Sequence, residues 1–395
     1  MAEISKLKLF LLNMSDQEIL KLIGANLPAD GKISGKAAGK TAAADGSVRW
    51  YDRKLCGLSR EGQKHLQELE EQLNDASRAH HVDLKQVRYL RQLKKMHMEV
   101  PVSFRLRTDP KAMFRRLQSF CRENDIPEDI LQRMVPALIT YMETGHMRPT
   151  LFVGEKGCGK TTAVRILAQE ALRIPTEVVK VPQTDGGQGL TGFCATYHSA
   201  DAGCLAKARL RSNSLLVAYI FDEIDKVPRD GNHASVDEAL LSVTDESCSD
   251  VYDNFLETTL VGLEHCPMFF TANDLDKVNP ILADRCNVIH FPNASASRIK
   301  SISRKYADRK MNSDLYSLIR FDYDLMDRHI DHLVAQDITS LRRHQQMIEA
   351  VLENALSTAL VQETDEIVDV TEDMFEDAER SILGTVRPRI GFGLK

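Results

Sequence analysis

The sequence lacks the features of a secreted or membrane-bound protein. No stretch of about 18 apolar residues occurs, which argues against a transmembrane helix. The N-terminus has no basic segment followed by an apolar core and a small-residue cleavage site, which argues against a signal peptide. The eight cysteines include no pair spaced as CxxC, so neither a disulfide framework nor a zinc site is expected. We therefore predict a cytoplasmic protein with free thiols that does not bind membranes.

An excess of positive charge is also missing. The 51 Lys and Arg residues are outnumbered by 57 Asp and Glu, and the formal net charge is -6. Overall charge therefore gives no argument for nucleic-acid binding, although it does not exclude a local basic patch. The hydrophobic fraction of 43% and the length of 395 residues fit a globular protein with two or three domains.

Residues 154–162 (GEKGCGKTT) match the phosphate-binding motif GxxxxGK[ST]. An apolar run at 150–153 predicts a buried strand before the motif, and residues 163–168 predict a helix after it. A strand, a glycine-rich turn and a helix N-terminus gather backbone N–H groups at one point, which favours a polyphosphate ligand. We expect Lys160 to reach the β- and γ-phosphates and Thr161 to hold Mg²⁺ through its hydroxyl. The predicted phosphate-binding residues are Gly154, Glu155, Lys156, Gly157, Cys158, Gly159, Lys160, Thr161 and Thr162.

Two carboxylates follow the apolar run at 215–221. A buried strand that ends in Asp222 and Glu223 places both at the carboxyl edge of a parallel sheet, beside the phosphate loop. We expect Asp222 to bind Mg²⁺ and to form part of the nucleotide site. We expect Glu223 to act as the base that polarises the attacking water. The sequence therefore predicts Mg²⁺-dependent ATP hydrolysis.

Asn273 and Arg285 complete the predicted catalytic set, and an arginine of the lid is added to the predicted nucleotide-binding residues. Asn273 ends an apolar strand at 268–272, where its amide can orient the water. Arg285 follows near a domain edge and can reach the γ-phosphate of a neighbouring subunit, where it would stabilise charge in the transition state. Arg342 or Arg343 begins a lid helix, and we expect Arg342 to contact the phosphates and couple nucleotide state to lid angle.

Composition and hydrophobic periodicity divide the chain into successive segments. Short apolar runs alternate with helical stretches in the middle of the chain, which predicts an α/β fold with a parallel sheet covered by helices on both faces. The stretch 59–98 is rich in Glu, Gln, Lys, Arg and Leu, and is either a solvated helix packed on the ATPase or an arm for oligomerisation or partner docking. The predicted order is an N-terminal helical segment (1–28), a flexible linker (29–48), a helical N-terminal region (49–145), a nucleotide-binding α/β domain (146–293), a helical lid (294–386) and a tail (387–395).

Taken in order, these motifs resemble those of the AAA+ ATPases over roughly residues 140–384. Residues 189–292 are similar to the ATPase module of the Lon family. The similarity is carried by the segments LTGFCATYH (190–198), FDEIDK (221–226) and TANDLD (271–276). It implies an AAA+ P-loop sheet followed by a small helical lid, with ATP and Mg²⁺ as cofactors and a ring of subunits, most often a homo-hexamer.

The resemblance also assigns a substrate-gripping loop, and it has limits. Tyr197 stands where the family has the aromatic residue of its pore loop, and His198 replaces the apolar residue that usually follows. The family's peptidase domain, with its Ser–Lys dyad, would follow the lid, and the sequence ends at Lys395. We therefore expect an ATPase without peptidase activity of its own.

Three functions remain open at this point. The first is a protein remodeller or unfoldase, the second a nucleic-acid motor or loader, and the third a nucleotide-switched scaffold that recruits a separate effector in trans. Tyr197 favours a protein substrate, and the acidic total charge weakly opposes DNA. The second function is kept open by the basic residues Arg88, Arg91, Lys94, Lys95, Arg105 and Arg107.

Overall fold

The structure is a computed structural model that describes residues 60–79, 83–99, 110–194, 200–227, 234–245, 251–361 and 366–384. The predicted N-terminal segment, the linker and the tail lie outside these residues. So do Tyr197 and His198. Among the described helices, none has the length and apolar character needed to cross a membrane.

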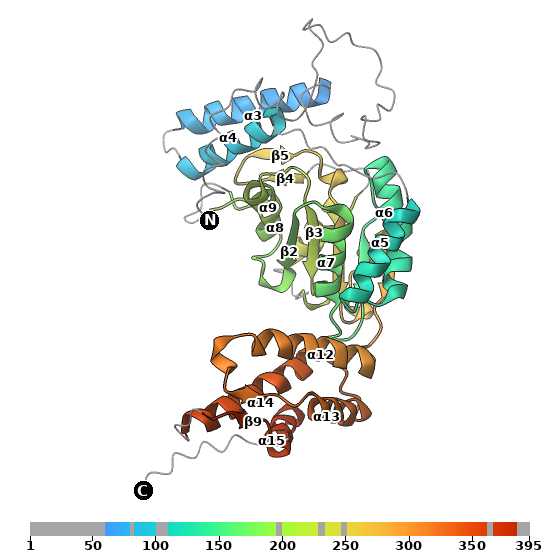
Figure 1. Cartoon of the computed structure of the whole chain (residues 1–395). Coiled ribbons are helices and arrows are strands. Elements are labelled where there is room, and N and C mark those ends of the chain that lie inside the picture. Colours follow the sequence, from blue (N-terminus) through green and yellow to red (C-terminus); the bar gives the residue numbers. More distant parts are fainter. Residues whose placement is uncertain are drawn as a thin grey trace, which may run out of the picture. The chain divides into compact units, whose positions relative to one another are not determined.

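A five-stranded parallel sheet forms the centre of the fold, and its strands β2 and β3 are labelled in Figure 1. The strand order is β2-β3-β6-β1-β7. Every residue of β1 and β6 is buried, which means that both faces of the sheet are covered and confirms the predicted α/β architecture. Because β1 lies between β6 and β7, the turns after β1 and β6 are neighbours at the carboxyl edge. The strands are β1 (Thr150–Val153), β2 (Thr176–Lys180), β3 (Ala218–Asp222), β6 (Met268–Ala272) and β7 (Asn287–His290).

Helices and one antiparallel hairpin connect these strands. The helices are α7 (Lys160–Leu172), α8 (Gln188–Thr191), α9 (Cys204–Ser212), α10 (Ala234–Val243) and α11 (Pro280–Arg285). The hairpin consists of β4 (Val251–Asp253) and β5 (Thr258–Leu260). Helix α7 contacts β2, β3 and β6, so the helix that follows the phosphate loop packs across the centre of the sheet.

Within the described residues, the helices that precede the sheet are α3 (Arg60–Arg78), α4 (Leu84–Glu99), α5 (Pro110–Glu123) and α6 (Glu128–Thr144). Helices α3 and α4 form a hairpin in which Lys94 Nζ lies 2.9 Å from Glu70 Oε1. Gln86 Nε2 of α4 donates to the carbonyl oxygen of Phe255 in the β4–β5 hairpin at 2.6 Å. Gln92 Nε2 donates to the carbonyl of Leu210 on α9 at 2.6 Å. The charged stretch is therefore a helical hairpin whose second helix packs on the sheet region.

The described helices of the lid are α12 (Ala296–Met311), α13 (Tyr323–Ala335), α14 (Leu341–Val361) and α15 (Glu372–Leu383). The short strands β8 (Ile319–Arg320) and β9 (Val368–Asp369) pair in parallel between them. The lid has its own hydrophobic cluster, centred on buried residues such as Ile330, Ile348 and Phe375. Separate cores leave the polar surfaces of the sheet edge and the lid free to form a site.

Candidate functional site

The phosphate loop joins β1 to α7 through glycines whose replacement would strain the backbone or cause a steric clash. Gly157 and Gly159 have φ values of +83° and +94°, in the left-handed region that favours glycine. A Cβ at Gly154 would lie 2.6 Å from the carbonyl oxygen of Phe291. The tight turn directs the N-terminus of α7 at the carboxyl edge of the sheet, as an anion site requires.

Lys160 occupies the centre of this edge. Its Nζ donates to the carbonyl oxygens of Gly154 (2.6 Å) and Glu155 (2.8 Å) and to Oδ1 of Asn273 (3.1 Å). The side chain is buried, and this desolvation lowers its pKa, with partial opposition from Cys158 and nearby carboxylates. An entering phosphate would exchange these neutral acceptors for a charged one, which a lysine ammonium binds more strongly.

Thr161 and Asp222 meet as the sequence predicts. Asp222 Oδ1 accepts hydrogen bonds from Thr161 Oγ1 at 2.6 Å and from Thr271 Oγ1 at 2.5 Å. Hydroxyl and carboxylate oxygens are hard donors of the kind Mg²⁺ prefers. The residues present therefore fit a magnesium ion that also binds phosphate oxygens.

Glu223 follows Asp222 in an unusual backbone conformation, with φ 61° and ψ 45°. Its N–H donates to Thr271 Oγ1 at 3.1 Å, and its half-exposed carboxylate pairs with Lys226. Asn273 is oriented from both ends, because Oδ1 accepts from Lys160 and Nδ2 donates to Asp225 Oδ2 at 3.3 Å. Glu223 and Asn273 thus follow the ends of the adjacent strands β3 and β6.

A cavity of about 740 Å³ opens beside these groups. Its wall includes most of the predicted residues: Lys156, Gly157, Gly159, Lys160, Thr161, Thr162, Asp222, Glu223, Asn273 and Arg342. Gly154, Glu155 and Cys158 do not line it. The first two supply carbonyl groups to Lys160, and Cys158 is buried.

The lid contributes the opposite wall of this cavity. Arg298, Lys305, Arg309 and Arg342 are all lid residues, and the lid adds no carboxylate to the lining. The N–H of Leu341 donates to the carbonyl oxygen of Gly157 at 3.0 Å, so α14 begins directly on the phosphate loop. Arg342 lines the cavity and Arg343 does not, which separates two residues that the sequence left as alternatives.

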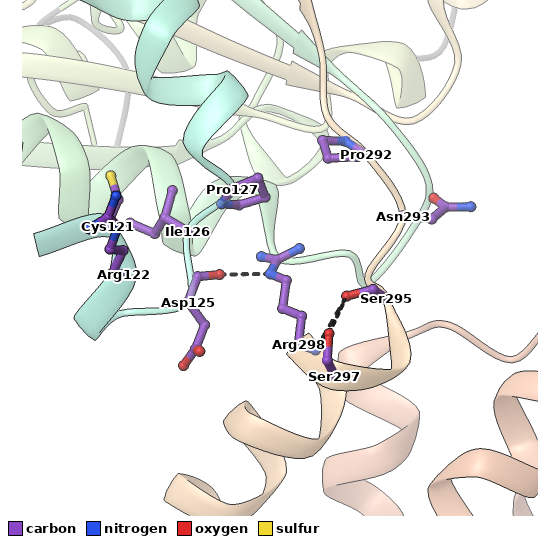
Figure 2. A pocket seen from close by; sticks show the side chains of 10 residues that line it. All are labelled: Cys121, Arg122, Asp125, Ile126, Pro127, Pro292, Asn293, Ser295, Ser297 and Arg298. Atoms are coloured by element: carbon purple, nitrogen blue, oxygen red, sulfur yellow. Dashed lines mark hydrogen bonds between the residues drawn. The ribbon is translucent and has the colours of Figure 1, made fainter. Parts of the chain in front are cut away.

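A second cavity of about 510 Å³ lies where the turn between α5 and α6 meets the start of α12 (Figure 2). Arg298 Nε donates to the carbonyl oxygen of Asp125 at 2.7 Å, and its guanidinium lies over the ring of Phe291. Its Nη1 is buried without a hydrogen-bond partner. Asp125, Ile126 and Arg298 line both cavities, so the two spaces adjoin.

Residues 150–293 match the family model described as "ATPase family associated with various cellular activities (AAA)". We call these residues the AAA module, because they match this family model. The predicted resemblance to the AAA+ ATPases is therefore confirmed, and the sheet, phosphate loop and strand-end carboxylates belong to this AAA module.

The AAA module is similar in sequence to Lon proteases. Lon protease homolog 2, peroxisomal, of Caenorhabditis briggsae is 25% identical over 257 residues, which are 64% of this chain and 32% of that protein. The Lon protease of Cytophaga hutchinsonii is 28% identical over 243 residues, 60% of this chain and 29% of that protein. The chain thus spans about a third of the length of these relatives.

A solved structure shows the same fold. The closed-state cryo-EM reconstruction of Hsp104 with ATPγS and FITC casein superposes with a TM-score of 0.54 at 14% sequence identity. The match covers 79% of this chain and 59% of the Hsp104 chain. The similarity extends beyond the AAA module, whose residues 150–293 are a smaller part of the chain.

Arg285 lies away from the cavity of its own AAA module. It ends α11, where Nη1 donates to the carbonyl oxygen of Leu241 at 2.6 Å and Nη2 to Asp245 Oδ2 at 3.2 Å. It is therefore the one described catalytic residue of the predicted set that the structure does not bring to the phosphate loop.

Several residues at the site were not predicted. Thr271 lies inside an apolar strand and Asp225 in a short 3-10 turn, so neither stands out by spacing. The lid cations Arg298, Lys305 and Arg309 belong to a helix rich in basic residues, in which sequence alone does not mark those that face the AAA module.

Proposed function

We propose that this protein is a magnesium-dependent ATP hydrolase that assembles into a ring and remodels protein chains. The observation that carries the ATPase part is the convergence of Lys160, the Thr161–Asp222 pair and Glu223 on one cavity. Lys160 would bind the β- and γ-phosphates, and Thr161 with Asp222 would hold Mg²⁺, whose charge would offset that of the phosphates. Glu223 accepts a proton from the attacking water, which the amide of Asn273 helps to orient.

The second cavity suits the base and ribose of the nucleotide. It adjoins the phosphate cavity and offers apolar walls from Ile126, Pro127 and Pro292. Arg298 lines both spaces and has a buried N–H group for a nucleotide acceptor. ATP spanning both cavities would contact the helical N-terminal region, the AAA module and the lid at once.

Support for a protein substrate comes from the relatives. Those with similar sequences are named proteases, and Hsp104 was solved with casein. We assign Tyr197 to grip the substrate, with His198 beside it. A nucleic-acid motor is the second candidate, because Arg88 and Arg91 are exposed on one face of α4. A scaffold that recruits an effector in trans is the third.

ATP turnover with and without candidate substrates separates these functions. We expect casein to stimulate hydrolysis and to remain uncut, whereas single- or double-stranded DNA should have no effect. Lys160→Ala should abolish ATP binding, since it removes the charged phosphate ligand. Stimulation by DNA alone would favour the nucleic-acid motor, and casein cleavage that copurifies with the chain would refute the absence of a peptidase.

We further propose that Arg285 acts on the nucleotide of the neighbouring subunit in a ring, most simply a homo-hexamer. Its position away from its own phosphate loop supports this role. Arg285→Ala and Lys160→Ala proteins should each be inactive, but their mixture should regain partial activity at interfaces that pair an intact loop with an intact arginine. An inactive mixture of co-assembled chains would contradict the proposal.

We expect the protein to act in the cytoplasm. The C. briggsae relative is named peroxisomal, so the site of action cannot be taken from the family. A fluorescent fusion of the full chain that concentrates in an organelle would correct this expectation.

A further inference from the structure

The guanidinium of Arg285 is bonded within its own chain, at the end of α10. Its Nη1 donates to the carbonyl oxygen of Leu241 at 2.6 Å, and its Nη2 donates to Asp245 Oδ2 at 3.2 Å. Leu241 belongs to the last turn of α10, where carbonyl groups lack partners within the helix. The helix dipole also favours a cation at this end. A carboxylate and a helix terminus therefore hold the guanidinium together.

The backbone that carries Arg285 is anchored by other residues. Arg148 donates from Nε to the carbonyl oxygen of Arg285 at 3.0 Å, and from Nη2 to that of Asp284. Two residues after Arg285, the N–H of Asn287 in β7 donates to the carbonyl oxygen of Pro149 at 2.7 Å. The main chain at the end of α11 is thus fixed to the sheet without the side chain of Arg285. That side chain can leave its present partners by rotating about its own bonds.

The ion pair between Arg285 and Asp245 is suited to release. The side chains are 31% and 33% exposed, and a pair this exposed changes an equilibrium constant only a few-fold, because water screens it. Its bonds to Asp245 and Leu241 use two of the five N–H donors of the guanidinium. A polyphosphate offers several charged oxygens and can accept two parallel bonds from one guanidinium. A phosphate that comes within reach should therefore displace Asp245.

We propose that Asp245 is a positioning residue, which holds Arg285 in a stored position on α10 until the nucleotide of a neighbouring subunit takes its place. The inference rests on the proposed action of Arg285 in trans. Neither residue lines the nucleotide cavity of its own subunit. The stored position therefore leaves the local site unchanged and sets how far assembly must proceed before hydrolysis begins.

Asp245→Asn should weaken the stored position while keeping its shape. The amide oxygen still accepts a hydrogen bond but carries no charge, so Arg285 should be released for a larger fraction of the time. Apparent affinity rises in proportion to the fraction of the competent state. We expect the protein concentration that gives half-maximal ATP turnover per chain to fall about threefold, at unchanged maximal turnover. Asp245→Glu keeps the charge and should stay close to the native protein.

The sign of this effect separates storage from a structural role. If Asp245 only kept Arg285 in its working position, its loss would raise the half-maximal concentration or lower the maximal turnover. Either result in a folded Asp245→Asn protein would overturn the inference.

Two nearby carboxylates supply matched controls. Asp237, also on α10, accepts from Asn279 Nδ2 at 3.3 Å and so joins α10 to the opposite end of α11 from Arg285. Asp284 is exposed, directly precedes Arg285 and is not among its hydrogen-bond partners. Asp237→Asn and Asp284→Asn should each leave the half-maximal concentration unchanged. A shift in Asp284→Asn equal to that in Asp245→Asn would show that surface charge alone sets assembly, which would overturn the inference.

Mixed assemblies test whether Asp245 acts through Arg285. In a mixture of Lys160→Ala and Arg285→Ala chains, the first supplies the arginine and the second supplies the intact phosphate loop. Asp245→Asn added to the Lys160→Ala chain should lower the half-maximal concentration of the mixture about threefold. The same substitution added to the Arg285→Ala chain has no arginine to release and should change nothing. Copurification of differently tagged chains establishes that the two proteins assemble together.

The outcomes distinguish this inference from the proposed function. An equal effect of Asp245→Asn in either chain, or an effect in neither, would overturn the inference while the action of Arg285 in trans would stand. A mixture with native Asp245 that stays inactive although its chains co-assemble would overturn both. If Asp245→Asn does not fold, Asp245→Ala removes the same carboxylate and decides the question in the same mixtures.

Discussion

The two walls of the nucleotide cavity differ in the charges they provide. The AAA module supplies Asp222 and Glu223 at the end of β3, together with Lys160 at the start of α7. The lid supplies four cations and no carboxylate. The wall from the AAA module can therefore hold a metal and accept a proton, whereas the lid wall can only attract and stabilise negative charge.

The walls also differ in how their side chains are held. Asp222 and Asn273 are fixed by hydrogen bonds to neighbouring strand ends, within one hydrophobic core. The lid residues belong to a second core and meet the first through a few contacts, such as Leu341 with Gly157. Proton transfer needs fixed geometry, whereas a cation can stabilise phosphate charge from a separately packed wall. Under the proposed function, the AAA module would carry out the chemistry and the lid would sense the nucleotide.

The largest effect should follow from Glu223→Gln. The variant keeps the shape of the side chain but removes the base, so turnover should fall at least about 100-fold while ATP still binds. Equilibrium binding of a fluorescent ATP analogue and steady-state hydrolysis measure the two quantities separately. Glu238→Gln, at an exposed site on α10, is the control. Undiminished hydrolysis in Glu223→Gln would show that Glu223 is not the base.

A smaller effect should separate two neighbouring arginines of the lid. Arg342 lines the cavity and Arg343 does not. Arg342→Ala should weaken ATP affinity or turnover roughly tenfold, as expected for the loss of a charged hydrogen bond to phosphate. Arg343→Ala should stay within about twofold of the native protein in the same titration. Equal losses from both substitutions would show that the lid acts through overall charge rather than one contact.

The smallest effect concerns the acid stability of the lid. His344 is buried on α14, and its Nε2 donates to the carbonyl oxygen of Ile338 at 2.9 Å. Burial lowers its pKa, so the unfolded chain takes up a proton before the folded protein does. Its contribution to stability is therefore present above about pH 6.5 and is lost as pH falls through the lowered pKa. Urea unfolding at pH values between 8 and 5 measures how the free energy of unfolding declines with acid. This decline should be shallower in His344→Gln than in the native protein, by up to about 1.4 kcal/mol per pH unit.

Sequence predicted the AAA module better than the lid for a physical reason. The phosphate loop and the Asp222–Glu223 pair are contiguous and sit at strand ends, where a parallel sheet must bring them together. Thr271 escaped notice because its role depends on the register of β6 beside β3, which places its hydroxyl against Asp222. That register is a tertiary property, and no local pattern encodes it.

The positions of the lid cations also depend on tertiary structure and were harder still to predict from sequence. Arg298 meets the carbonyl of Asp125 across 173 residues of sequence. A basic amphipathic helix leaves open which of its charges face a partner. Arg342 lines the cavity beside the phosphate loop, and its contact with the phosphates stays a prediction. The roles of Arg285 and Tyr197 stay predictions, since one requires a neighbouring subunit and the other lies outside the described residues.

The left-handed backbone of Glu223 has a consequence for evolution and engineering. A residue with a Cβ pays on the order of 1 kcal/mol to adopt this conformation, which glycine adopts freely and asparagine tolerates better. A library selected only for heat resistance should therefore enrich glycine or asparagine at this position. The enriched variants would be more stable, but they would lack the proposed base and could not hydrolyse ATP. A screen for thermal stability would therefore select inactive variants unless hydrolysis were selected in parallel.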